Sequence, residues 1–218
     1  MLVQISLFDG FDLMDAVGPY EIFCAAELIS DGAIRAEFVS AEGARTLKSS
    51  ITNTEISASG ILDPSLADII LVPGAAGRTS GHNSIEAILQ RAANTDLSSL
   101  VKQSLHDPNK TIATVCGGSL LLAMNGLLKG RYAVTNHGGM QALGDLGAYP
   151  IDARIVENGN LISSAGVTSG IDLAIYLVEK FVGPKVAHIV EKLMEFERRG
   201  SVWKDEGVMP QKEFVQYS

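Results

Sequence analysis

Short, uninterrupted hydrophobic runs alternate along the chain with segments whose hydrophobic residues recur every three or four positions. Uninterrupted runs suit the strands of a parallel sheet that is covered on both faces, and the three- to four-residue spacing is typical of amphipathic helices. The strands predicted in this way span residues 2–8, 34–41, 68–73 and 111–115. Strands and helices in alternation predict an α/β fold with a mostly parallel central sheet.

The same pattern predicts six helices. One opens at Gly18-Pro19, because proline is favoured in the first turn of a helix. The others span residues 84–93, 97–106, 118–128, 168–183 and 184–199. The alternation is interrupted at residues 52–59 and again at residues 153–165, where Asn158-Gly159 separates two hydrophobic stretches and predicts a hairpin.

The length of the chain favours a single domain. Its 218 residues suffice to bury a full core but are few for two ordinary domains, so we assign residues 1–203 to one domain. Residues 204–218 mix charges with glycine and proline without clear periodicity and are expected to form a tail, either frayed or docked on a partner subunit. The first residues are expected to form a strand rather than a signal peptide, and no hydrophobic stretch reaches the roughly 20 residues that would cross a bilayer.

Net charge and cysteine content limit the expected partners and compartment. The formal net charge is -8, and the sequence contains no local cluster of lysine and arginine. Both features disfavour nucleic-acid binding, so the expected partner is a small molecule. The two cysteines, Cys24 and Cys116, lie far apart and show neither metal-ligand spacing nor a disulfide framework. They favour free thiols in a reducing cytoplasm, without a metal site.

Cys116 is the candidate nucleophile. It follows the predicted strand 111–115 and precedes Gly117, Gly118 and a helical segment, an order typical of a nucleophile elbow at the carboxyl end of a strand. The helix N-terminus that follows is expected to lower the pKa of the thiol. The alternative is that Cys116 is a small buried hydrophobic residue, the role we assign to Cys24 inside a helical segment.

Three further segments carry candidate chemistry. Asp9, Asp12 and Asp15 follow the first strand, and we expect one of their carboxyl groups to face the thiol as an acid or base. Spacing does not choose among them. The alternative for each is a solvated loop residue or a negative charge that stabilises a helix N-terminus. The small residues that follow Pro73-Gly74 would let backbone N–H groups approach an anion. His137 is a candidate ligand contact whose alternative is a structural, hydrogen-bonded histidine.

Several blocks spread over most of the chain resemble the DJ-1/PfpI superfamily, and within it the isocyanide hydratases. These blocks are LMDAVGPYEIF, ILVPGAAG, TVCGGSLLLAMNGLLKG, VTNHGG and SAGVTSGIDLAIYLVE. The resemblance implies a flavodoxin-like three-layer sandwich, a homodimer with its sites near the subunit interface, and no metal or organic cofactor. It implies that Cys116 is the nucleophile and Asp15 its acidic partner. The ligand pocket implied by the matching blocks includes Gly74, Ala75, Gly117 and His137.

The chain departs from the family pattern beside the cysteine. Gly117 stands where related peptidases carry His and hydratases often carry Thr, Ala75 replaces a glycine, and Gly138 replaces an aromatic residue. The function that the resemblance implies is hydration of an isocyanide to an N-substituted formamide. The alternatives are glyoxalase- or amidase-like chemistry on a small carbonyl compound, and a non-catalytic module that binds a ligand or senses redox state.

Overall fold

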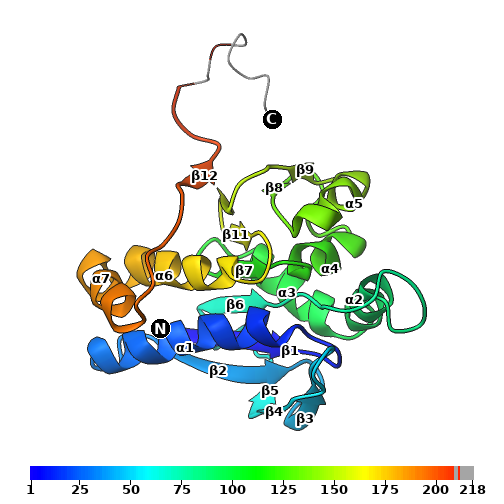
Figure 1. The fold of residues 1–218 in the computed structure, drawn as a ribbon, viewed down its shortest axis with the longest axis horizontal. Helices are drawn as coiled ribbons and strands as arrows, with labels where there is room; N and C mark the ends of the chain where they lie inside the picture. Colours follow the sequence, from blue (N-terminus) through cyan, green and yellow to red (C-terminus); the bar gives the residue numbers. More distant parts are fainter. Residues whose placement is uncertain (209–210, 212–218) are drawn as a thin grey trace.

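The central element of the protein is an eight-stranded sheet that lies between two layers of helices (Figure 1). The computed structural model describes residues 1–208 and 211. The strands are β1 Leu2–Leu7, β2 Arg35–Ser40, β3 Arg45–Lys48, β4 Glu55–Ala58, β5 Gly60–Ile61, β6 Ile69–Val72, β7 Thr111–Val115, β8 Tyr132–Ala133, β9 Tyr149–Pro150, β10 Ile155–Asn158, β11 Leu161–Ser164 and β12 Val202–Lys204. The helices are α1 Leu13–Ile29, α2 Ile85–Ala93, α3 Leu97–Leu105, α4 Gly118–Met124, α5 Met140–Asp145, α6 Ser169–Phe181 and α7 Pro184–Leu193, with one 3-10 turn, η1 His137–Gly139.

The order of strands in the main sheet is β12-β10-β11-β7-β6-β1-β2-β5. Neighbours from β11 to β5 are parallel, whereas β10 is antiparallel to β11. Strands β6 and β7 lie in the middle, and every residue of both is buried, which explains their uninterrupted hydrophobic runs. The arrangement confirms the α/β sandwich with a mostly parallel central sheet that the sequence predicts.

Both interruptions of the alternation correspond to antiparallel pairs. The predicted hairpin at residues 153–165 is formed by β10 and β11, in which Asn158 pairs with Leu161. The stretch at residues 52–59 contains β4, which pairs with β3 outside the main sheet. This second hairpin is joined to the loop between β1 and α1, because the N–H of Gly10 donates to the carbonyl of Lys48 (2.8 Å).

Two groups of helices cover the two faces of the sheet. Helix α1 packs against α6 and α7, and α4 packs against α2, as the separated groups in Figure 1 show. Two predicted helices end early, α4 at Met124 and α7 at Leu193, because the chain turns through positive φ at Gly126 (70°) and Glu195 (49°). In the described part of the chain, no helix combines the length and the hydrophobicity needed to cross a membrane.

Helix α1 begins at Leu13, five residues before the predicted opening at Gly18-Pro19, so that prediction is wrong. Asp12 starts the helix because its carboxylate accepts the N–H of Met14 (2.9 Å). Pro19 lies inside the helix, where its missing N–H removes one intrahelical hydrogen bond. It packs against Gly170 of α6, where an ideal Cβ would lie 3.2 Å from the proline ring. The early start places Asp15 in the first turn of α1.

The end of the described chain joins the main sheet. Strand β12 pairs in parallel with β10, and the ammonium group of Lys204 lies 3.2 Å from the carboxylate of Glu157. Lys180 and Tyr176 of α6 also bind that carboxylate, which lowers the pKa of Glu157 against the effect of burial. The tail expected at residues 204–218 thus begins inside β12, and its residues 209–210 and 212–218 lie outside the described part.

A substitution at Gly118 tests how closely α4 packs against β6. An ideal Cβ on Gly118 would overlap the carbonyl oxygen of Val72. We expect Gly118→Ala to lower the free energy of unfolding by about 1–3 kcal/mol, because backbone on both sides must move. Urea unfolding followed by circular dichroism measures the loss. The control is Gly60→Ala, where nothing lies within 4 Å of an added Cβ; equal effects of both substitutions would contradict the tight approach.

Candidate active site

The backbone of Cys116 is held in a sharp turn between β7 and α4. Its φ is +55°, a value that non-glycine residues adopt rarely. The N–H of Cys116 donates to the carbonyls of Ser164 (3.1 Å) and Ala165 (2.8 Å), and its own carbonyl accepts the hydroxyl of Thr135 (2.7 Å). These three hydrogen bonds fix a strained turn of the kind found in nucleophile elbows.

The turn that follows β6 touches the turn that follows β7. An ideal Cβ on Gly74 would overlap the backbone of Gly117 and would lie 2.9 Å from the carboxylate of Asp15. An ideal Cβ on Gly117 would in turn lie 3.6 Å from the amide nitrogen of Ala75. The ends of the two central strands therefore meet where the sequence predicts ligand-binding backbone.

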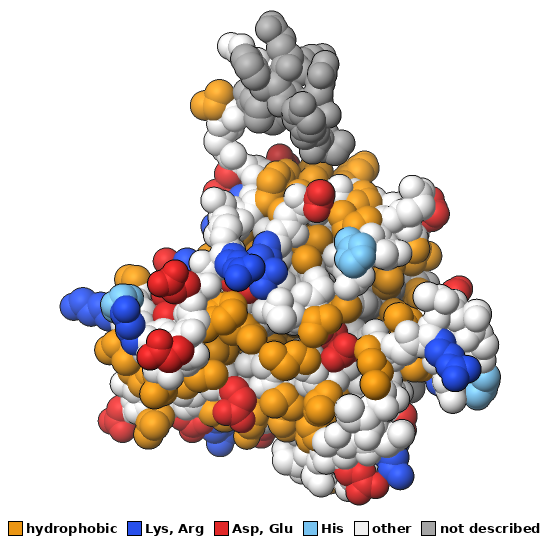
Figure 2. Space-filling view, viewed as in Figure 1, with side chains coloured by type: hydrophobic (Ala, Val, Ile, Leu, Met, Phe, Trp, Pro, Cys, Tyr) orange, Lys and Arg blue, Asp and Glu red, His pale blue; other side chains and the backbone are white. Residues whose placement is uncertain are grey.

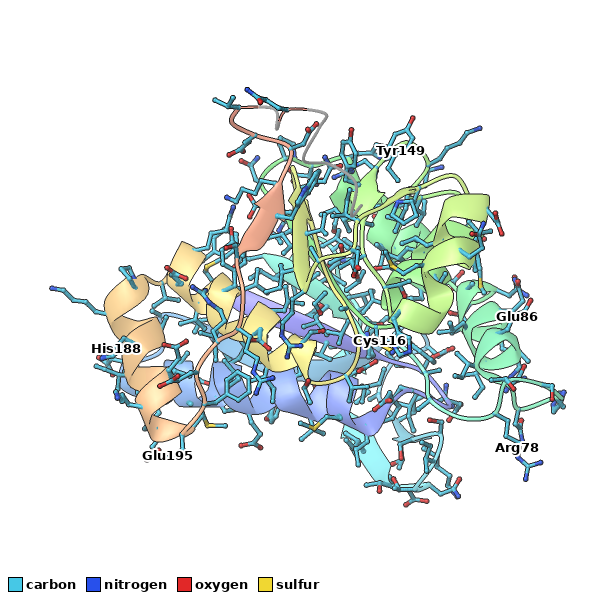
Figure 3. The ribbon with its side chains drawn as sticks, turned by 45° about the horizontal axis from the view of Figure 1, so that its top comes forward. Arg78, Glu86, Cys116, Tyr149, His188 and Glu195 are labelled. Atoms are coloured by element: carbon cyan, nitrogen blue, oxygen red, sulfur yellow. The ribbon has the colours of Figure 1, made fainter. Side chains whose placement is uncertain are left out.

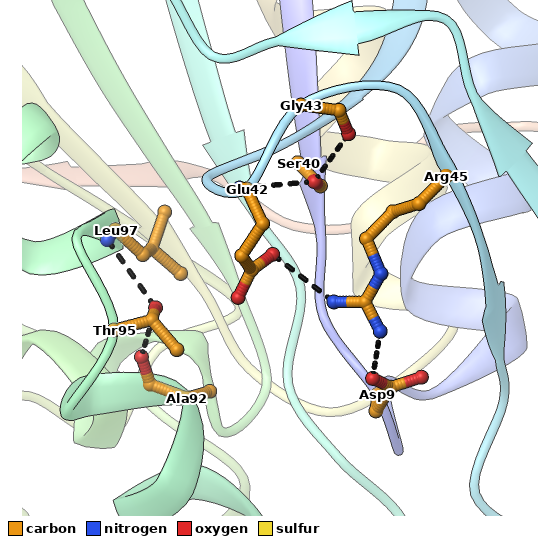
Figure 4. A network of polar contacts seen from close by, with 8 residues as sticks. All are labelled: Asp9, Ser40, Glu42, Gly43, Arg45, Ala92, Thr95 and Leu97. Carbon is orange, nitrogen blue, oxygen red and sulfur yellow. Dashed lines mark hydrogen bonds and ion pairs between the residues drawn. The ribbon is translucent and has the colours of Figure 1, made fainter.

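Asp15 projects from the first turn of α1 into this junction. Its side chain is fully buried, and Oδ2 accepts the N–H of Gly74 (3.0 Å). Oδ1 has no hydrogen-bond partner within the described residues, and the Cys116 thiol lies beside the carboxyl group. Spacing left three aspartates open, and the structure brings to the thiol Asp15, the one that the family resemblance implies. Asp12 caps α1, and Asp9 pairs with Arg45 at the surface (Figure 4).

Burial controls the charge of both groups. Burial, followed by the negative charge of Asp12, raises the pKa of Asp15 to about 8, although the Gly74 N–H and the thiol favour the charged form. Burial, followed by Asp15, raises the pKa of Cys116 to about 12, against hydrogen bonds from the N–H groups of Val167 and Gly117. Both shifts favour the uncharged forms, a carboxylic acid beside a thiol.

The expectation that a helix N-terminus lowers the pKa of the thiol is therefore wrong for this structure. Helix α4 contains only seven residues, and its N-cap makes no side-chain hydrogen bond. The thiol is 6% exposed, so the loss of water around a thiolate outweighs the short helix dipole. Cys116 lies deep in the centre of the molecule, whereas Arg78 and Glu86 lie outward from it (Figure 3).

The remaining candidates occupy two different environments. Ala75 is buried and pairs with Phe11 in an isolated bridge that fixes the turn after β6. His137 is exposed in η1, and no hydrogen bond among the described residues joins its imidazole to Cys116 or Asp15. In the same turn, the side chain of Asn136 accepts the N–H of Gly138 (3.0 Å). The histidine is thus on the surface near the site rather than within it.

Two residues of the site have no prediction from the sequence. Thr135 anchors the carbonyl of Cys116, and Val167, at an unusual φ of +41°, directs its N–H at the sulfur. Both lie in blocks that carry the family resemblance, VTNHGG and SAGVTSGID, but neither has a chemically reactive side chain. The role of Val167 depends on the direction of its backbone N–H, and that of Thr135 on the approach of its hydroxyl to a distant carbonyl, neither of which residue type reveals.

Two clefts open on the surface beside the site. The larger, about 690 Å³, lies between the β3–β4 hairpin and the segment from Ala76 to Asn83. The smaller, about 290 Å³, is lined by the start of α1 and by residues 49–52. Asp12 lines the smaller cleft and Ala76 lines both. Each cleft therefore adjoins a segment that builds the Cys116 and Asp15 junction.

Comparison with known proteins matches this arrangement to a family. Residues 1–180 match the DJ-1/PfpI family. The chain belongs to this family. It is 29% identical over 201 residues to the isonitrile hydratase of Pseudomonas putida, a match that covers 90% of this chain and 79% of that protein. It is 30% identical over 128 residues to protein DJ-1alpha of Drosophila melanogaster, covering 58% of this chain and 54% of that protein.

Solved structures of DJ-1/PfpI proteins share the fold. The crystal structure of Drosophila melanogaster DJ-1beta superposes with a TM-score of 0.75 at 19% identity and covers 90% of this chain and 98% of that one. A ThiJ/PfpI family protein from Pseudomonas syringae superposes with a TM-score of 0.72 at 23% identity, covering 91% of this chain and 76% of that one. These matches confirm the flavodoxin-like architecture.

The raised pKa of Asp15 predicts how stability depends on pH. Between its ordinary value of 3.8 and about 8, the folded protein keeps a proton that the unfolded chain releases, so this group makes stability fall as pH rises. We expect Asp15→Asn to unfold like the wild type near pH 4 and to be more stable near pH 8, by on the order of a few kcal/mol. Thermal unfolding at both pH values measures the difference. The exposed Asp31→Asn is the control; a destabilised Asp15→Asn at pH 8 would mean that the carboxylate is charged.

Proposed function

We propose that the protein is a cysteine-dependent hydratase that adds water to an isocyanide and releases an N-substituted formamide. Cys116 would be the nucleophile and Asp15 the proton donor. The observation that carries this proposal is the position of the Asp15 carboxyl group, fully buried beside the Cys116 thiol, where burial raises its pKa to about 8. The similarity to an isonitrile hydratase over 90% of the chain supports the choice of substrate class.

The first step joins the sulfur to the terminal carbon of the isocyanide. The lone pair on that carbon takes the proton of Asp15, the sulfur forms the C–S bond, and one pair of C–N bonding electrons moves to nitrogen. The thiol proton passes to Asp15, which becomes neutral again. The product is a thioimidate, and no separated charge persists in the dry junction.

The second step consumes one water molecule. Water attacks the thioimidate carbon, and the nitrogen receives a proton; the C–S bond then breaks, the proton of the new hydroxyl group returns to sulfur, and the formamide leaves. The N–H groups of Val167 and Gly117 stabilise the sulfur as it gains electron density. The N–H of Ala75 would bind the new oxygen, the backbone of Gly74 would line the pocket beside it, and His137 would contact the outer end of the substrate. The chemistry requires no metal or organic cofactor.

Activity assays of three variants test the roles of the two groups. We expect Cys116→Ala and Asp15→Asn to lower formamide production from cyclohexyl isocyanide at least 100-fold, the usual loss for a nucleophile or a positioned acid. The wild-type rate should fall above a pH of about 8, where Asp15 loses its proton. Cys24→Ala is the matched control and should keep full activity. Full activity in Cys116→Ala, or no formamide from the wild type, would reject the proposal.

Carbonyl chemistry is the second candidate, because the amide nitrogen of Ala75 lies beside Gly117, where it would suit a carbonyl oxygen. In that case Cys116 would attack a small aldehyde or amide instead. Conversion of methylglyoxal to lactate, or release of ammonia from a small amide, separates this candidate from the hydratase. If the protein is inactive on the isocyanide, on methylglyoxal and on the amide, the remaining candidate is a non-catalytic module that binds a ligand or senses redox state.

We propose a homodimer that forms over the smaller cleft. Hydrophobic side chains gather over the α1 layer in Figure 2, and Met14 (38% exposed) and Ile51 (70% exposed) line this cleft. Asp12 lines it too, so a second subunit docked here would lie beside the active site of the first. Exposed hydrophobic patches of this kind are typical of subunit interfaces.

Sedimentation of a charge variant tests the dimer. We expect the wild type to sediment as a dimer. Ile51→Glu should shift the equilibrium toward the monomer, because the new carboxylate would lose its hydration when the interface forms. Ile61→Glu on the edge strand β5, where Ile61 is 56% exposed, is the control and should leave the dimer intact. Monomeric wild-type protein at micromolar concentration would reject the interface.

We propose the cytoplasm as the compartment in which the protein works. Both cysteines are free thiols, and the first step needs the Cys116 thiol in its reduced form. The partner we propose is a small molecule, because a chain with a net charge of -8 would be repelled by nucleic acid.

A further inference from the structure

We infer that the substrate of the Cys116 site carries an anionic group, a carboxylate or a phosphate, and that this group binds in the larger cleft. The inference rests on the proposed function and narrows its substrate class. Three observations support it: the position of the cleft, the charge of its lining, and the way in which its arginine residues are held.

Two residues that line the cleft are next in sequence to residues that contact the Cys116 turn. Ala76, which lines it, directly follows Ala75, and Ile88 directly precedes Leu89, whose side chain would lie 3.1 Å from a Cβ on Gly117. The hydroxyl of Ser50 accepts the N–H of Ala76 (3.2 Å) and so ties the β3–β4 hairpin to the turn after β6. A volume of about 690 Å³ is in the range of small-molecule sites, so a substrate that reaches Cys116 past Ala76 has room for a second group here.

The charge of the lining is opposite to that of the whole protein. The lining contains Lys48, Arg78 and Arg91 but only one carboxylate, Asp9, in a chain whose net charge is -8. Arg45, which lies outside the lining, already pairs with Asp9 (Figure 4). An anion entering this cleft would meet an excess of positive charge.

The two arginines remain available for a ligand. Lys48 pairs with Glu55 (3.3 Å), whereas neither Arg78 nor Arg91 forms an ion pair with any described residue. Arg91 is anchored because it donates to the carbonyl of His82 (2.8 Å). Arg78 lies on the outer loop that leads into α2 (Figure 3) and forms the rim. A guanidinium group binds carboxylate or phosphate oxygens through two parallel hydrogen bonds.

The first experiment compares a charged and a neutral substrate of similar shape. We expect 3-isocyanopropanoate to be turned over with a kcat/KM at least tenfold higher than its methyl ester. The double variant Arg78→Gln/Arg91→Gln should reduce this preference about tenfold, mainly through a higher KM for the acid, with the ester as internal reference in each variant. Lys102→Gln, on α3 and outside the cleft, is the control variant that should keep the preference. Equal turnover of acid and ester, or a preference that survives the double substitution, would overturn the inference.

The second experiment is independent of isocyanide chemistry. Isothermal titration with glutarate, inorganic phosphate and neutral glutaramide measures anion binding directly. We expect glutarate or phosphate to bind the wild type, with an affinity that falls at least tenfold in the double variant, and glutaramide not to bind. The anion that binds identifies the group. Binding without isocyanide turnover would reject the proposed function and keep the cleft as an anion site, whereas absence of binding by both anions would reject the inference. Circular dichroism confirms that each variant is folded.

Discussion

The contact between the turn after β6 and the turn after β7 is the constraint on which the site depends. Gly74 and Gly117 lie so close that a side chain on the first would overlap the backbone of the second, and Gly118 lies against the carbonyl of Val72. This approach lets the N–H of Gly74 reach Asp15 and excludes water from the space around the carboxyl group. Without it, the carboxyl group and the thiol would be separate, hydrated groups with ordinary protonation behaviour.

Burial then limits the chemistry that is open to this pair. A thiol in water or at the start of a long helix gains reactivity as a free thiolate, but here the pKa of Cys116 rises to about 12 and that of Asp15 to about 8. A neutral acid beside a neutral thiol suits a reaction that adds sulfur and a proton to the same carbon. The backbone N–H groups of Val167 and Gly117 partly offset the effect of burial on the thiol, and they would also stabilise the sulfur as it gains electron density.

The glycine at position 117 shapes the space above the sulfur. Leu89 of α2 lies against the face of Gly117, so the volume that a larger side chain would occupy is filled by a hydrophobic residue of a neighbouring helix. The same helix contributes Ile88 and Arg91 to the larger cleft. We therefore expect α2 and the segment that precedes it, rather than residue 117, to shape the space available to a ligand.

Much of the fold was predictable because its central strands are buried on both faces. Local sequence is sufficient to predict β6 and β7 from their uninterrupted hydrophobic runs, and the β10–β11 hairpin from Asn158-Gly159. The glycines after Cys116 likewise predict the sharp turn. The start of α1 was misjudged because proline is a strong local signal, whereas its tolerance inside the helix depends on packing against Gly170 of α6.

Local sequence was enough to predict the central strands β1, β2, β6 and β7, most of the helices, the turn at Cys116 and the acidic residues after β1, but not β8, β9, β12 or α5. Spacing did not choose among the three aspartates, and the fold places Asp15 beside the thiol, as the family resemblance implies. The fold also places His137 at the surface and, through burial, raises the pKa of both Asp15 and Cys116. The physical reason is that burial and close approach arise from segments far apart in the chain, and these two factors set the pKa of a group more strongly than its neighbours in sequence do.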